Sequence, residues 1–158
     1  KRARSFGIAI HYHNRNQLPN QIEDIYEATY WKNLDEMIRR MDIISINCPL
    51  TKETRGLMSS KRLQLMMSEA FIINSSRSEI IDENALAKLL KANKIAGAGL
   101  DVFSRGRGNN VDLIDAPNTI LIPHMGSATV EGRIEMGEKV IVNIKTYIDG
   151  HNPPNRII

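Results

Sequence analysis

Residues 42–47 read DIISIN, a short apolar run that ends in an asparagine. Three more runs of this kind follow: AFIIN at residues 70–74, IAGAGLDV at 95–102 and TILIPH at 119–124. None of the four alternates apolar with polar residues, which is the pattern of strands buried on both faces, as in a parallel sheet. The spacing between successive runs leaves room for a strand, a crossover helix and two loops. We therefore predict a parallel sheet with helical crossovers.

Helical patterns fill the gaps between these runs. Asn33, Ser59 or Ser60, and Asp82 are predicted to cap three helices, because each precedes an apolar periodic segment. The clearest helix is the last one, since its apolar residues recur at steps of four and three and Gly150 follows them. This stripe consists of Val130, Ile134, Gly137, Ile141, Ile144 and Ile148.

Two further strands are predicted at residues 7–12 and 27–31, which read GIAIHY and EATYW. Strand and helix then alternate along the whole chain, with no internal repeat. The predicted fold class is therefore α/β, with a doubly wound parallel sheet.

The composition excludes several classes of protein. With 158 residues, the chain is long enough for one domain, and 42% hydrophobic with 25% charged residues is ordinary for a globular protein. No run approaches the roughly 18 apolar residues of a membrane helix. Cys48 is the single cysteine, so no intramolecular disulfide forms and we expect a cytoplasmic protein. A net charge of +3 is too small to indicate nucleic acid.

The ends of the predicted strands carry the residues whose side chains could bind a ligand or react with one. In doubly wound sheets, ligands bind outside the carboxyl ends of the strands. Four successive strand ends are expected to bring Cys48, Arg77, Asp101 and His124 to one side of the sheet. We therefore predict a ligand site at this edge.

Four sequence motifs lie at or beside these strand ends, in a fixed order along the chain. They are NCPLTKET at residues 47–54, NSSRSEIIDENAL at 74–86, GAGLDVF at 97–103 and PHMGSAT at 123–129. Together they resemble the nicotinamide-binding domain of the D-isomer-specific 2-hydroxyacid dehydrogenases, and most of all the glyoxylate and hydroxypyruvate reductases. The resemblance covers almost the whole chain. It implies a Rossmann-like sheet and an enzyme that transfers hydride between NAD(P)H and a small 2-keto or 2-hydroxy acid.

The resemblance also implies an incomplete domain. In the family, a Gly-rich dinucleotide loop precedes the segment that starts here, and residues 1–6 look like the tail of the helix after that loop. We expect residues 1–150 to form a partial dinucleotide-binding domain that lacks the first strand and the Gly-rich loop. Residues 151–158 are expected to begin the return to a substrate domain. By themselves, the 158 residues are expected to be inactive.

Two residues match the family's catalytic positions. Arg77 is expected to hold the substrate carboxylate, which guanidinium can grip through two parallel hydrogen bonds. His124 is expected to act as the acid and base, because imidazole exchanges protons near neutral pH.

Two departures from the family pattern affect this catalytic pair. Ser78 replaces the usual glycine and would be strained at a positive φ. Gly106 replaces the glutamate that hydrogen-bonds the histidine, and glycine can neither orient the imidazole nor favour its charged form. Asp112 and Asp115 are the candidate substitutes for that glutamate.

The resemblance implies a nicotinamide cofactor. The segment HYHNR at residues 11–15 offers no carboxylate for the adenosine ribose hydroxyls of NAD. Arg15 can instead pair with the 2′-phosphate of NADP, so we expect NADP to be preferred over NAD. Asp101 matches the residue near the carboxamide, and Cys48, Pro49 and Thr54 match the adenosine side. The complete set of expected cofactor contacts is Asn14, Arg15, Cys48, Pro49, Thr54, Ser75, Ser76, Arg77, Asp101, His124 and Gly126.

Other functions remain open or are disfavoured. A domain without the glutamate could bind cofactor or mediate dimers without turnover, as some corepressor relatives do. The loop SRGRGNN at residues 104–110 has two arginines but no aromatic residue, which is a poor nucleic-acid footprint. His11 and His13 lack a third metal ligand. We expect a small acid substrate, no metal, no nucleic acid, no membrane partner and a homodimer that buries the last helix.

Overall fold

The computed structural model describes residues 1–104 and 111–156. The chain divides into two compact units, Lys1–Leu121 and Ile122–Ile158. Gly106 lies outside the described residues, so its predicted part in the site stays a prediction. The domain boundary expected at residue 150 also stays a prediction.

The first unit opens with a small two-stranded parallel sheet. Its elements are α1 (Arg2–Ser5), β1 (Ile10–Tyr12), α2 (Asn20–Tyr26) and β2 (Ala28–Tyr30). β1 pairs with β2, with Ile10 opposite Ala28. Both strands were predicted, but α2 was not; it is short, and its apolar residues Ile22, Ile25 and Tyr26 stand at helical spacing without being buried.

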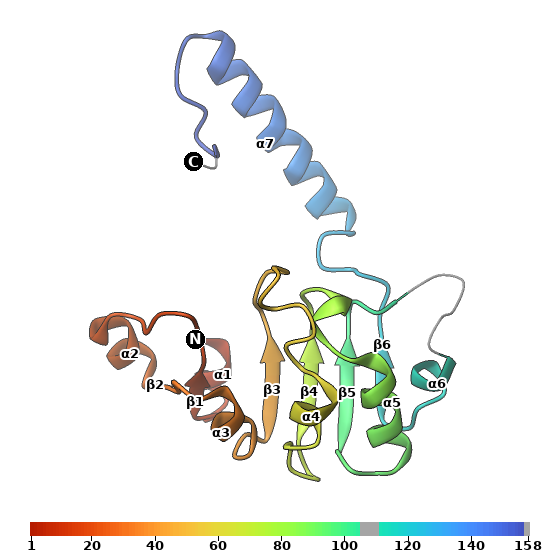
Figure 1. The fold of residues 1–158 in the computed structure, drawn as a ribbon. Helices are drawn as coiled ribbons and strands as arrows, with labels where there is room; N and C mark the ends of the chain where they lie inside the picture. The colour runs from red at the N-terminus through yellow and green to blue at the C-terminus, as the bar shows by residue number, and fades with distance from the viewer. Residues whose placement is uncertain (105–110, 157–158) are drawn as a thin grey trace. The chain divides into compact units, whose positions relative to one another are not determined.

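A four-stranded parallel sheet follows in the same unit (Figure 1). Its strands are β3 (Ile43–Ile46), β4 (Phe71–Asn74), β5 (Gly97–Leu100) and β6 (Thr119–Leu121), in the order β3-β4-β5-β6. Each strand is shorter than the apolar run that predicted it. The parallel pairing confirms the predicted α/β class.

Five helical elements lie between the strands from β2 to β6: α3 (Leu34–Ile38), α4 (Ser60–Leu63), the 3₁₀ turn η1 (Ser78–Ile80), α5 (Glu83–Lys91) and α6 (Val111–Ile114). Of these, α3, α4 and α5 begin where capping predicts. The side chains of Asn33, Ser59 and Asp82 accept hydrogen bonds from backbone N–H groups of the first turns of α3, α4 and α5. This satisfies N–H groups that have no partner inside a helix. The one-turn elements α6 and η1 carry no periodic signal and were not predicted.

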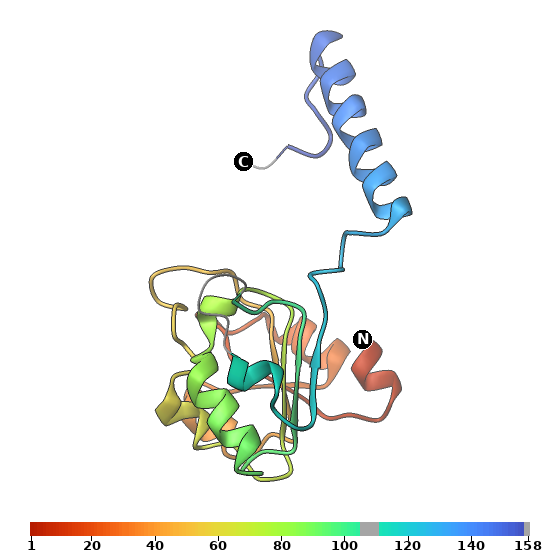
Figure 2. The ribbon, with the colours of Figure 1, turned by 90° about the vertical axis from the view of Figure 1, so that its right-hand side faces the viewer.

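Burial in the four-stranded sheet differs from the prediction. Along β3 and β4, exposed and buried residues alternate: Ile43 is 51% exposed and Phe71 46%, whereas Ile44 and Ile72 are buried. The prediction of two buried faces was therefore wrong for these strands. The reason is visible in Figure 2, where α4, α5 and α6 lie on the same side of the sheet. The buried residues of that side form the core with Leu63, Leu86 and Leu90 and their neighbours.

The second unit contains the predicted last helix, α7 (Val130–Ile148). It begins at Thr129, whose hydroxyl accepts a hydrogen bond from the Gly132 N–H at 3.0 Å. It stops before Gly150, which takes the left-handed φ of +80° that favours glycine. None of the residues of α7 is buried. Within the described part of the chain, every helix falls short of the length and apolarity that crossing a bilayer requires.

Candidate active site at the carboxyl edge of the sheet

Hydrogen bonds join the carboxyl ends of β3, β4 and β5. The Ser76 hydroxyl donates to the Cys48 carbonyl, which follows β3. The Asp101 N–H donates to the Asn74 carbonyl at 2.9 Å, linking the ends of β5 and β4. The first unit therefore brings together the strand-end segments that carry Cys48, Arg77 and Asp101, as parallel pairing predicts.

The segment after β4 presents Arg77 at this edge. The Arg77 side chain is exposed, and its Nη1 donates to the Ser76 carbonyl at 2.8 Å. Ser75 is exposed and Ser76 is half-buried. A guanidinium that keeps its remaining N–H groups toward solvent is available for a carboxylate or phosphate.

The serine that follows Arg77 causes no backbone strain. Ser78 opens η1 and does not belong to the residues with positive φ, so serine fits where the family has glycine. The pKa of Glu79 is lowered by its own backbone N–H and by the Ser78 hydroxyl, with smaller contributions from the charges of Arg55 and Arg77. Within the described part of the chain, no ion pair joins Arg77 to Glu79.

The segment after β3 forms a closed turn. The Thr54 hydroxyl donates to the Pro49 carbonyl and accepts from the Thr51 N–H, both at 2.7 Å. Cys48, Pro49 and Thr54 therefore belong to one structured loop. Burial raises the pKa of the Cys48 thiol, so the thiol is in its neutral form near pH 7 and is a poor nucleophile.

The end of β1 carries the expected adenosine-side residues. The Asn14 side chain accepts from the Arg15 N–H at 3.0 Å, and the Asn14 carbonyl accepts from the Tyr30 hydroxyl at 3.2 Å. Arg15 is exposed. Its charge contributes to the lowered pKa of Glu53, after the larger effect of the Thr51 hydroxyl. Arg15 and the loop after β3 therefore act on one another electrostatically.

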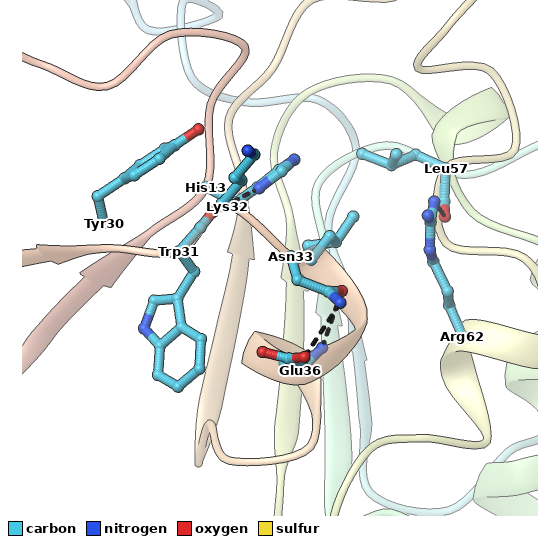
Figure 3. A pocket seen from close by; sticks show the side chains of 9 residues that line it. His13, Tyr30, Trp31, Lys32, Asn33, Glu36, Leu57 and Arg62 are labelled. Atoms are coloured by element: carbon cyan, nitrogen blue, oxygen red, sulfur yellow. Dashed lines mark hydrogen bonds between the residues drawn. The ribbon is translucent and has the colours of Figure 1, made fainter.

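A cavity of about 720 Å³ lies beside this region (Figure 3). Its lining mixes cationic, aromatic and apolar side chains from the ends of β1 and β2 and from the segments around α3 and α4. The lining residues are His13, Tyr30, Trp31, Lys32, Asn33, Leu34, Glu36, Leu57 and Arg62. None of the residues predicted to contact cofactor or substrate lines it, although His13 directly precedes Asn14.

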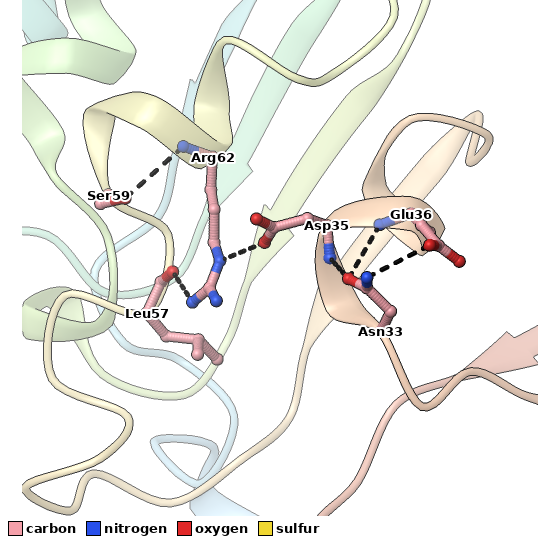
Figure 4. Close-up of polar contacts among 6 residues, drawn as sticks. All are labelled: Asn33, Asp35, Glu36, Leu57, Ser59 and Arg62. Atoms are coloured by element: carbon pink, nitrogen blue, oxygen red, sulfur yellow. Dashed lines mark hydrogen bonds and ion pairs between the residues drawn. The ribbon is translucent and has the colours of Figure 1, made fainter.

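Arg62, which lines the cavity, is held by two polar contacts of its side chain (Figure 4). Its Nε pairs with the Asp35 carboxylate at 2.7 Å, and its Nη1 donates to the Leu57 carbonyl at 2.9 Å. The hydrogen bond from Arg62 lowers the pKa of Asp35. Since Asp35 belongs to α3 and Arg62 to α4, the pair joins two crossover helices. The sequence offered no signal for this contact.

The two histidines of β1 and its end have hydrogen-bond partners in the protein. The Trp31 indole donates to His11 Nδ1 at 3.0 Å, and His13 Nδ1 lies 2.8 Å from the Trp31 carbonyl. The guanidinium of Arg40 also lies over the Trp31 ring, 5.4 Å from its centre. Among the described residues, no group of three potential ligands of the types His, Cys, Asp or Glu could hold a metal ion.

His124 and Gly126 belong to the second unit, between β6 and α7. Both are exposed. The His124 backbone takes a left-handed φ of +57°, which is uncommon for residues other than glycine and costs roughly 1 kcal/mol or more. Such strain is often found at functional positions. The grouping of His124 with Arg77 and Asp101 stays a prediction.

One candidate substitute for the absent glutamate has another partner. Asp112 pairs with Lys91 at 2.5 Å, and this contact lowers the pKa of Asp112. Lys91 ends α5, the helix that leads into β5, so it lies toward the amino ends of the strands. This contact holds Asp112 on the side of Lys91, which speaks against its serving this site, and the part of Asp115 stays a prediction.

The sequence profile described as "D-isomer specific 2-hydroxyacid dehydrogenase, NAD binding domain" matches residues 1–126. A glyoxylate reductase of Thermococcus litoralis is 41% identical over 157 residues, covering 99% of this chain and 47% of the relative. The chain thus spans about half the length of the curated relatives it matches.

Solved structures agree with this match. A crystal structure from Polaromonas sp. JS6 66, described as a putative NAD-binding D-isomer specific 2-hydroxyacid dehydrogenase, is 36% identical with a TM-score of 0.88, covering 99% of this chain and 49% of the other. An NADPH-dependent glyoxylate/hydroxypyruvate reductase from Sinorhizobium meliloti, in complex with NADP and malonate, is 32% identical with a TM-score of 0.82, covering 93% and 44%. The chain therefore belongs to the D-isomer specific 2-hydroxyacid dehydrogenase family and carries its NAD-binding domain.

Proposed function

We propose that the protein containing this chain is an oxidoreductase that interconverts a small 2-keto acid and its 2-hydroxy acid, with glyoxylate or hydroxypyruvate as the substrate. The observation that carries the proposal is the exposed Arg77 guanidinium on a hydrogen-bonded segment at the strand-end edge that also holds Asp101. The family, and relatives that are glyoxylate reductases, support it.

The residues at this edge fit a nicotinamide dinucleotide. Polar and cationic groups from β1, β3, β4 and β5 stand at the carboxyl ends, where doubly wound sheets bind dinucleotides. Arg15 would hold the adenosine end, the loop from Cys48 to Thr54 would flank it, and Ser75, Ser76 and Asp101 would lie along the nicotinamide half. The bound cofactor supplies the hydride.

The chain's own residues would bind the acid and move a proton. Arg77 would hold the substrate carboxylate through paired N–H donors and polarise the keto oxygen. His124 would donate a proton to the alkoxide oxygen as it forms, and would take it back in the oxidative direction. The left-handed backbone of His124 supports a functional position, because local strain persists where function selects it.

We further propose that NADP is preferred over NAD. Arg15 is exposed, and no carboxylate occupies residues 11–15, where it would serve the ribose hydroxyls. Arg15→Ala is expected to raise the Kd of NADPH by roughly tenfold or more while changing that of NADH by less than about threefold, because only NADPH carries the 2′-phosphate. Fluorescence titration of the full-length protein with both cofactors measures this. Equal effects on both would contradict the preference.

The activity itself is tested with the full-length protein. Oxidation of NADPH or NADH is followed at a fixed enzyme concentration with glyoxylate, hydroxypyruvate and a neutral aldehyde of similar size. We expect turnover of the two acids and little of the aldehyde, since Arg77 recognises the carboxylate. Arg77→Ala should lower kcat/KM for the acids by roughly a hundredfold or more. Absence of turnover, or an Arg77→Ala variant with normal kcat/KM, rejects the proposed function.

A second candidate is a cofactor-binding or dimerisation module without turnover. The observation that favours it is Gly106, which stands where the family has its glutamate. The apolar stripe along α7, which includes Val130 and Ile148, favours a homodimer that covers this helix. Cofactor binding without turnover, together with a dimer in sedimentation experiments, would select this alternative. In both cases residues 1–150 are proposed to form part of the dinucleotide-binding domain, with residues 151–158 leading out of it.

A further inference from the structure

Asn74 is the one buried polar side chain in the described part of the chain. It ends β4 and is 1% exposed, on the side of the sheet that also buries Ile72. Placing an amide in such a position costs free energy unless the amide forms hydrogen bonds. A leucine or isoleucine would continue the apolar run of β4 without that cost. The amide therefore needs an explanation beyond packing.

Both ends of the Asn74 amide bind the backbone of the Arg77 segment. The Nδ2 group donates to the Arg77 carbonyl at 2.9 Å, and Oδ1 accepts from the Ser76 N–H at 3.0 Å. The Asn74 backbone carbonyl also accepts from the Asp101 N–H. One residue thus links the end of β5 to the peptide group before Ser76 and to the peptide group after Arg77, which bracket the Ser76–Arg77 segment.

These hydrogen bonds fix the backbone from which the Arg77 side chain extends. Residues 74–77 leave the strand and turn into η1, and Arg77 is the extended residue between them, with φ −140° and ψ 141°. The Arg77 side chain then bonds to the Ser76 carbonyl of the same segment. A carboxylate-binding arginine works only when its two N–H donors are aimed correctly, and displacement by about 1 Å can cost roughly a hundredfold in rate.

We propose that Asn74 is a positioning residue for substrate recognition: its buried amide holds the Arg77 backbone in place, so that the guanidinium faces the substrate carboxylate at the carboxyl edge of the sheet. Asn74 itself lies in the protein interior and acts only through Arg77. The inference rests on the proposed role of Arg77.

Two variants remove the contacts in different ways. Asn74→Leu keeps the approximate volume and removes both bonds. Asn74→Asp keeps the acceptor for the Ser76 N–H and replaces the donor that faces the Arg77 carbonyl with a second carboxylate oxygen, which repels that carbonyl. It therefore disturbs one of the two contacts and carries the test if the leucine variant does not fold. In the full-length protein, both are expected to lower kcat/KM for glyoxylate by roughly 10- to 100-fold, mainly through KM. The Kd of NADPH, measured by fluorescence, should change by less than about threefold.

A double-mutant cycle separates positioning from general damage. In an Arg77→Ala background, the Asn74 variants should lower kcat/KM by less than about twofold more, because Asn74 acts through a side chain that is already gone. An equal loss in both backgrounds overturns the proposal. If Arg77→Ala alone leaves kcat/KM unchanged, the proposed function fails instead, so the two failures are distinguishable.

Asn143 on α7 supplies a control for the change from amide to carboxylate. Its Nδ2 donates to the Lys139 carbonyl at 2.8 Å, and its Oδ1 accepts from the Asn155 N–H at 3.1 Å, so both ends of its half-buried amide also bind backbone groups. Asn143→Asp is expected to leave kcat/KM within about twofold of the parent. A loss equal to that of Asn74→Asp would show a nonspecific effect of the substitution and would overturn the proposal.

Discussion

Replacing Gly97 with alanine should destabilise the sheet that carries the site. Gly97 begins β5, and a Cβ atom there would lie 2.7 Å from the Asn118 carbonyl oxygen and 3.0 Å from the Phe71 ring. The carbonyl cannot move away freely, because it accepts a hydrogen bond from the Ala98 N–H at 3.0 Å. Its residue, Asn118, also has a left-handed φ of +54°. The added methyl group therefore meets backbone that is already held in place.

The size of the effect follows from these contacts. Overpacking of a close-packed site costs about 1–3 kcal/mol. Lengthening the bond between Ala98 and Asn118 adds up to about 1 kcal/mol. Replacing glycine returns about 0.5–1 kcal/mol, because alanine has less conformational freedom in the unfolded chain. The net loss in the free energy of unfolding is about 2 kcal/mol, or about 4–8 °C in Tm for a chain of this size.

Urea unfolding followed by circular dichroism measures this loss, with Gly99→Ala as the matched control. A Cβ at Gly99 would lie 3.0 Å from Ile73 Cδ1, the tip of a side chain that is 37% exposed and can rotate away. We expect that variant to change the free energy of unfolding by less than about 0.5 kcal/mol. The steric reasoning is refuted if Gly97→Ala unfolds at the parent's urea midpoint, or if both glycine variants lose the same stability.

Three further predictions concern charge and catalysis. Asp35→Asn should lower the free energy of unfolding by up to about 1 kcal/mol at pH 7, a modest value because the pair with Arg62 is partly exposed and screened by solvent. Arg62 lowers the pKa of Asp35 in the folded state. The stability difference between the parent and Asp35→Asn should therefore be present above the ordinary carboxyl pKa of about 4 and disappear as the pH falls through the lowered pKa. Urea titrations of both proteins at pH 7 and pH 3 measure this, and a stability difference independent of pH contradicts the linkage. His124→Asn should keep Tm within about 2 °C of the parent's value, because asparagine tolerates the left-handed backbone. It should lower kcat for the keto acid by roughly a hundredfold or more. Near-normal kcat in steady-state assays would exclude His124 as the acid. Gly106→Glu should raise turnover and shift the acidic limb of the pH–rate profile if it restores the family's partner for the histidine, and an unchanged profile would show that Gly106 is not the missing element.

Local sequence patterns predicted most of the secondary structure. A cap such as Asn33 or Asp82 bonds N–H groups within three residues, so the information lies next to it in the chain. The parallel strands were recognisable because apolar runs repeat at crossover spacing. Helix α2 escaped prediction because it begins after Pro19 without a side-chain cap and leaves its isoleucines partly exposed. Its apolar residues Ile22, Ile25 and Tyr26 stand at helical spacing, but the pattern covers only the 7 residues of the helix and is therefore weak.

The candidate site was predictable in part. Parallel pairing sends all carboxyl ends to one edge, so the association of Cys48, Arg77 and Asp101 followed from the order of strands and motifs. The bonds that hold Arg77 did not follow, because an asparagine at the end of an apolar run is read as a turn residue. Its burial depends on elements that pack on that side of β4 from earlier and later parts of the chain.

The amino-acid sequence by itself determined the α/β class, the parallel strands, the helix caps and the family, because each depends on neighbouring residues or ordered motifs. Tertiary structure decided which face of the sheet is buried. Ile43 and Ile44 are identical neighbours, yet one is 51% exposed and the other 6%. Successive side chains of a strand point to opposite faces, and Ile44 faces the side on which the core forms, where α4, α5 and α6 also lie (Figure 2). The same packing buries Asn74 and turns its amide toward the segment that carries Arg77.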